Sequence, residues 1–172
     1  MSIVSVKIMS QKFRVSFNSP QSGFMSVGLR AGEQEFVAAV AHKPYDSLRD
    51  LLVALTALLT SDGEHVVKWN CEPDELDFNL TADAERVRLD VVHYLSHRRS
   101  RRTSQQVFTI AGTKLDICGA FWKALRELHR DIETDDFAGN WRRAFPETEM
   151  QDLTKAIRAR KHEMKLGTRQ HG

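Results

Sequence analysis

The shortness of the links between alternating segments constrains the fold of this chain most. Apolar and polar residues alternate, as in half-buried strands, over residues 3–9, 12–17, 24–31, 35–42, 64–70, 76–82, 85–96 and 103–112. Most of the links are turn-sized and rich in Gly, Pro, Asn and Ser. Parallel neighbours need a long crossover, which these links do not provide. The pattern therefore predicts an antiparallel sheet of six to eight strands over the first two-thirds of the chain.

One helix interrupts this series. Residues 46–61 carry a leucine stripe. The N-cap candidate is Asp46 or Ser47, and Ser47 and Asp50 have the spacing of a capping box. The stripe consists of Leu48, Leu51, Leu52, Leu55, Leu58 and Leu59. Such a stripe either docks a partner helix or covers the underside of a sheet, and we expect the second.

The last third of the chain has a helical period. Residues 113–133 begin with Thr113 and Asp116 at capping-box spacing, and residues 147–166 form another apolar stripe that includes Met164. Between them, residues 134–146 are predicted to be a loop whose three aromatic side chains tuck under the body. We predict an α+β fold with one helix inserted mid-chain and C-terminal helices packed on one face of the antiparallel sheet.

The length suits one domain over residues 1–172. Within it, the sheet and its helix take residues 1–112, a helical part takes 113–166, and 167–172 are a frayed end.

Composition is that of a globular protein without a membrane span, and the cytoplasm is the expected compartment. The two cysteines form no CxxC pair, which fits a reducing environment. Charge is uneven: residues 1–96 carry 9 basic and 13 acidic side chains, whereas residues 97–172 carry 16 and 10. The basic half is a global hint of an anionic partner.

No standard catalytic or nucleotide-binding motif occurs in the chain. His93 and His97 lie on a predicted strand, where their separation of roughly 13 Å is too large for two ligands of one metal ion. The acidic pair Asp135–Asp136 is predicted to be exposed, with nothing to raise a pKa for acid-base work. We therefore expect no enzyme activity, no cofactor and no metal site.

Two charged runs are the candidate contact sites. The first holds Arg98, Arg99, Arg101 and Arg102 between two predicted strands. It is expected to be the solvated tip of a hairpin. The alternatives are a docking loop for an acidic protein and a contact with phosphate or nucleic acid, the latter helped by Arg158, Arg160 and Lys161.

The second run is acidic. Glu72, Asp74, Glu75 and Asp77 fall within seven positions of the segment CEPDELD. A solvated turn is the simplest interpretation. The functional alternative is an acidic surface presented to a basic partner, such as the active-site groove of a nuclease.

The order of PYDSLRDLLVALTALL, VVKWNCEPDELDFNL, VRLDVV and NWRRAFP resembles small bacterial immunity proteins of toxin–immunity systems. The resemblance spans roughly residues 24–150, and the basic hairpin and basic C-terminal helix depart from it. It implies a scaffold that binds a protein partner and performs no chemistry. The expected function is a cytoplasmic immunity protein that neutralises a toxin by direct binding, and the alternative is an RNA- or DNA-binding accessory protein acting through residues 97–102. Oligomeric state is left open.

Overall fold

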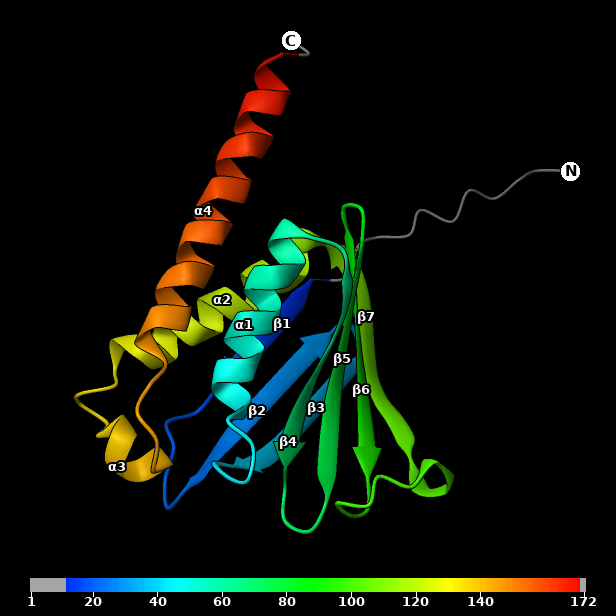
Figure 1. The fold of residues 1–172 in the computed structure, drawn as a ribbon, viewed down its shortest axis with the longest axis vertical. Helices are drawn as coiled ribbons and strands as arrows, with labels where there is room; N and C mark the ends of the chain where they lie inside the picture. The colour runs from blue at the N-terminus through cyan, green and yellow to red at the C-terminus, as the bar shows by residue number, and fades with distance from the viewer. Residues whose placement is uncertain (1–11, 171–172) are drawn as a thin grey trace, which may run out of the picture.

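The computed structural model describes residues 12–170, so the predicted strand at 3–9 lies outside the described residues. Figure 1 shows a curved sheet with helices packed over it. The strands are β1 (Phe13–Phe17), β2 (Phe24–Ala31), β3 (Gln34–Ala41), β4 (Gly63–Asn70), β5 (Glu75–Asp83), β6 (Arg86–Tyr94) and β7 (Gln105–Thr113). The α-helices are α1 (Ser47–Thr60), α2 (Lys114–Arg130), α3 (Phe137–Trp141) and α4 (Glu147–Arg169), and a 3₁₀ helix spans Arg101–Thr103.

The seven described strands form one sheet whose spatial order equals their order in the chain, with every neighbour antiparallel. The predicted α+β class and the inserted helix are confirmed. Strand β3 meets β4 only at the pair Ala41–Asn70, so the sheet opens into two leaves, β1–β3 and β4–β7. At the other end of β3, the Gln34 side-chain amide donates to the Thr109 carbonyl oxygen on β7 at 3.0 Å and accepts from the Thr109 N–H at 3.2 Å.

Helix α1 covers the sheet, and all six leucines of its stripe are buried, as predicted. Of the two N-cap candidates, Asp46 occupies the position, but its side chain makes no capping bond, so the predicted Ser47–Asp50 capping box is wrong. The Ser47 hydroxyl instead donates to the Lys68 carbonyl of β4. The Ser47 side chain therefore bonds to a distant strand instead of capping its own helix.

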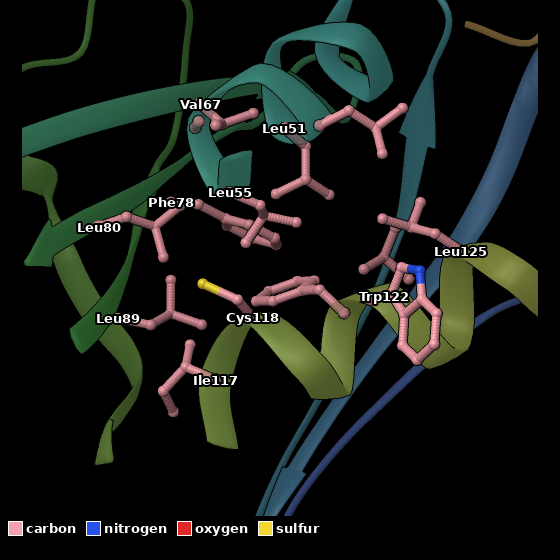
Figure 2. Packing of buried hydrophobic residues seen from close by; sticks show 14 of the residues in the cluster. Leu51, Leu55, Val67, Phe78, Leu80, Leu89, Ile117, Cys118, Trp122 and Leu125 are labelled. Carbon is pink, nitrogen blue, oxygen red and sulfur yellow. The ribbon is translucent and has the colours of Figure 1, made fainter. Parts of the chain in front are cut away.

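Helix α2 begins with the predicted capping box. The Thr113 hydroxyl accepts from the Asp116 N–H, and the Asp116 carboxylate accepts from the Thr113 N–H. Its buried face meets α1 and the sheet, and Figure 2 shows Ile117, Cys118 and Leu125 gathered with side chains from α1 and the strands. Each such buried side chain contributes about 1.5–3 kcal/mol of burial free energy.

Two predictions for the C-terminal part need correction. The segment 134–146 contains the short helix α3, although its aromatics Phe137, Trp141 and Phe145 are buried as expected. Helix α4 continues through Arg169, so the predicted frayed end does not begin at 167. Met164 is 54% exposed, because the buried residues of α4 are Met150, Leu153 and Ile157, in the first half of the helix. Within residues 12–170, no helix combines the length and the apolar character needed to cross a membrane.

Candidate functional site

Three connections meet at one end of the sheet and bring most of the predicted site residues together. They are the β3–α1 connection at residues 42–46, the β4–β5 turn at 71–74 and the β6–β7 connection at 95–104. We call the last of these the arginine loop. An open depression of about 720 Å³ lies between the three, lined in part by Tyr45, Glu72 and His97.

Arg99 turns inward from the arginine loop. Its Nε donates to Asp77 Oδ1 at 3.0 Å, its Nη2 to Glu75 Oε2 at 3.0 Å and its Nη1 to the Tyr45 hydroxyl at 2.8 Å. The Tyr45 hydroxyl in turn donates to Glu75 Oε1 at 3.1 Å. The guanidinium also lies 5.2 Å from the Tyr45 ring centroid and 5.9 Å from that of Tyr94. All three nitrogens of this guanidinium therefore donate to groups of the protein itself.

This cluster is buried. The Arg99 side chain is 16% exposed, and those of Glu75 and Asp77 are 3% and 10% exposed. Two carboxylates without this guanidinium would be buried and unpaired, which proteins rarely tolerate. Arg99 also has a φ of 46°, in the left-handed region that non-glycine residues seldom adopt. The cluster therefore ties the arginine loop to β5 and to Tyr45.

The charges of the cluster act on its own ionisation. Burial alone would lower the pKa of Arg99, but hydrogen bonds to Tyr45 and Asp77 and the nearby carboxylates outweigh it and raise that pKa. Burial, together with the charge of Asp77, raises the pKa of Tyr94. Arg99 thus stays charged, and Tyr94 stays neutral, at neutral pH.

The arginine loop was expected to be a solvated tip. This prediction is correct for Arg98, Arg101 and Arg102, which are exposed, and wrong for Arg99. The 3₁₀ helix at Arg101–Thr103 shapes the loop, with the Ser104 N–H donating to the Arg101 carbonyl at 3.3 Å. Three arginines therefore extend from a backbone that the fourth holds in place.

The acidic run was expected to be a solvated turn, and the structure divides it. Glu72 is exposed. Asp74 is half-buried, and its Oδ2 lies within hydrogen-bond distance of His93 Nε2, at 2.7 Å. Glu75 and Asp77 lie inside β5 and are buried against Arg99, so for them the prediction is wrong. Asp77 lies within the alternating part of the run, which was the available signal that it belongs to a strand rather than to a turn.

The other expected contact residues are partly engaged. Arg160 is paired with Glu85, and Lys161 Nζ lies 4.9 Å from the Trp122 ring centroid, whereas Arg158 is exposed. Cys71, beside the cluster, has a pKa raised to about 12 by burial and by the charges of Asp74 and Glu75. Among residues 12–170, no group of three His, Cys, Asp or Glu side chains is arranged to hold a metal ion.

Comparison with known proteins finds no matching family model, no matching curated protein and no matching solved structure.

Proposed function

We propose that this protein is a cytoplasmic, non-enzymatic protein-binding module whose arginine loop contacts an acidic surface of a partner. The observation that carries the proposal is that four neighbouring arginines differ in their environment. Arg99 is bound inside the protein, and Arg98, Arg101 and Arg102 are exposed on the loop that it holds. The ion cluster therefore presents three exposed arginines on a loop that is tied to the body of the protein, which suits a contact role.

Preorganisation is the physical reason why this arrangement suits binding. Ordering a flexible loop at an interface costs free energy, and a loop that is already fixed avoids that cost. Arginine is enriched at interfaces because its planar guanidinium pairs with carboxylates through two hydrogen bonds. Exposed Glu72 and half-buried Asp74 adjoin the loop and offer the opposite charge at the edge of the same surface.

The resemblance to bacterial immunity proteins suggests the kind of partner. We propose that the partner is a toxin, and that the arginine loop and Glu72 bind it directly. An immunity protein acts by occupying a surface of the toxin, so its charges need to complement that surface rather than to perform chemistry.

The test is co-expression with the product of the neighbouring gene, followed by size exclusion and a growth assay. We expect a complex and protection of the cells. The triple variant Arg98→Ala/Arg101→Ala/Arg102→Ala should lose both while its unfolding midpoint stays unchanged. The matched control Arg158→Ala/Lys165→Ala/Arg169→Ala removes the same charge from exposed positions of α4 and should retain both. Absence of a complex and of protection with the wild type would reject the immunity role.

Nucleic-acid binding is the second candidate, favoured by three exposed arginines within five positions. Figure 1 places the arginine loop and α4 on opposite sides of the molecule, so the two basic regions do not form one continuous track. Phosphate contacts would give affinity that falls steeply with salt. Titration of a labelled single strand at several salt concentrations measures this. Salt-sensitive binding that the triple variant loses would favour this candidate over the first.

A further inference from the structure

A second surface lies away from the arginine loop, between β1 and α2. An open groove of about 550 Å³ runs there, with Phe13 and Val15 on the strand side and Ala120 and Lys123 on the helix side. Gly119 lies at its floor, where an added Cβ would meet no atom within 4 Å. The groove therefore has room for side chains that belong to another segment.

The backbone of β1 offers hydrogen bonds to this groove. The Asn18 N–H donates to the Ser26 carbonyl at 3.0 Å, in the same register as the β1–β2 pairing. Bonded pairs alternate along antiparallel strands, so the even-numbered residues of β1 bond to β2. The N–H and C=O groups of Phe13, Val15 and Phe17 then point away from β2. Within residues 12–170, no strand pairs with this outer edge of β1.

The groove is basic. Its residues include four basic and two acidic side chains, and the Asp116 carboxylate is already engaged by the Thr113 N–H at 3.1 Å. The basic side chains stand on both sides of the groove: Lys12 and Arg14 from the strand side, Lys123 and Lys161 from the helix side. An anionic occupant would meet positive charge on either side.

We propose that this groove binds an extended acidic segment of a partner protein, which adds to β1 as an antiparallel strand. Strand addition supplies main-chain hydrogen bonds at the edge, and alternate side chains fill the pocket beside it. Apolar side chains of the segment would lie on the helix-facing side of the sheet, beside Phe13 and Val15, and the intervening acidic side chains would lie on the other side, beside Lys12 and Arg14. A nucleic acid cannot supply this backbone ladder. The proposal does not depend on the arginine loop, which lies elsewhere in the fold (Figure 1).

The probe is the fluorescein-labelled peptide EVEVDVE, titrated by anisotropy against the full chain. We expect saturable binding at micromolar concentrations that weakens with salt. In the proposed register the valines bond to β1, so methylating their backbone nitrogens should abolish binding. Methylating the backbone nitrogens of the acidic residues, which point away from β1, should leave binding intact. Comparison of the two methylated peptides therefore distinguishes strand addition from simple charge attraction.

Two protein variants test the same geometry. Val15→Pro removes an outward N–H without touching a bond to β2, a position where edge strands accept proline. Gly119→Leu fills the floor of the groove. Each should raise the Kd at least tenfold with an unchanged circular dichroism spectrum. The triple arginine-loop variant is the matched control and should bind the probe as the wild type does, which keeps this test distinct from that of the proposed function.

Four outcomes would overturn the proposal. The first is no saturable binding, and the second is equal binding of both methylated peptides. The third is a disulfide that forms spontaneously between Ser5→Cys and Ser16→Cys in the full chain, because the chain's own residues 3–9 would then occupy the groove. The fourth is a dimer in sedimentation that Val15→Pro dissolves, because a second copy would then be the occupant.

Discussion

Strand β5 is buried on both of its faces, by two different kinds of chemistry. Leu76, Phe78 and Leu80 face the apolar core beneath the helices. On the opposite face, Glu75 and Asp77 are covered by Arg99 from the arginine loop. One strand therefore carries an apolar core on one side and an ion cluster on the other.

The two faces differ in what they specify. Apolar burial has no preferred direction, and it tolerates changes of shape when volume is kept. The ion cluster requires particular atoms at particular positions, since each charge is buried and depends on its partners. We therefore expect the apolar face to supply most of the stability and the charged face to determine the conformation of the arginine loop.

The largest expected effect is on the apolar face. Phe78→Ala removes a ring that lies 5.5 Å from Trp69 and 6.3 Å from Phe121, measured between centroids. We expect the free energy of unfolding to fall by about 4 kcal/mol through lost burial and a cavity. Urea unfolding measures it. A loss below about 1 kcal/mol would show that the core repacks around the site, contrary to this account.

Arg99→Ala should come next, with a loss of about 3 kcal/mol, because Glu75 and Asp77 are left buried and unpaired. Amide exchange in residues 95–104 should rise, while exchange in α1 changes little. The triple variant Arg99→Met/Glu75→Gln/Asp77→Leu, which removes all three charges, should recover most of the stability but not the protection of the loop. Recovery of both would mean that the cluster does not fix the loop.

Thr113→Ala tests a local motif by comparison with these long-range contacts. Loss of the hydroxyl that caps α2 should cost about 1 kcal/mol. Differential scanning calorimetry measures the loss. Thr60→Ala is the control, because the Thr60 hydroxyl bonds only to carbonyl groups at the exposed end of α1. The idea fails if the two variants lose the same stability.

The smallest expected effect on stability at neutral pH comes from the thiols of Cys71 and Cys118. The pKa of Cys118 is raised to about 12 by burial, although Lys114 opposes the shift, and that of Cys71 is raised to about 12 as well. A raised pKa favours the neutral thiol in the folded state. The associated stability is therefore complete below the unfolded value of 9.0 and is lost as pH rises from 9.0 towards 12.

Melting temperatures across that alkaline range measure this effect. We expect the decline to be shallower in Cys71→Ser and in Cys118→Ala than in the wild type. At pH 8, both native thiols should react slowly with a disulfide reagent, because burial favours the protonated thiol over the reactive thiolate. Rapid reaction of the native protein would contradict the raised pKa values.

The sequence predicts the apolar face well and the charged face poorly. Alternation in β5 and the leucine stripe of α1 report burial directly, because side-chain period follows backbone geometry. The run of four arginines contains no signal that selects Arg99, since the choice depends on a left-handed φ and on carboxylates more than twenty positions away. The capping residues behave similarly: Thr113 keeps its local partner, whereas Ser47 bonds to β4.

The two attachments of β3 have a structural consequence. The leaves β1–β3 and β4–β7 are joined through hydrogen-bonded backbone at Ala41–Asn70 and where the Gln34 amide meets Thr109, and their side chains also share one core. All other strand pairings join segments adjacent along the polypeptide and can form as hairpins. The seam beside β3 is therefore the place in the described sheet where the strand ladder depends on residues that are distant along the chain.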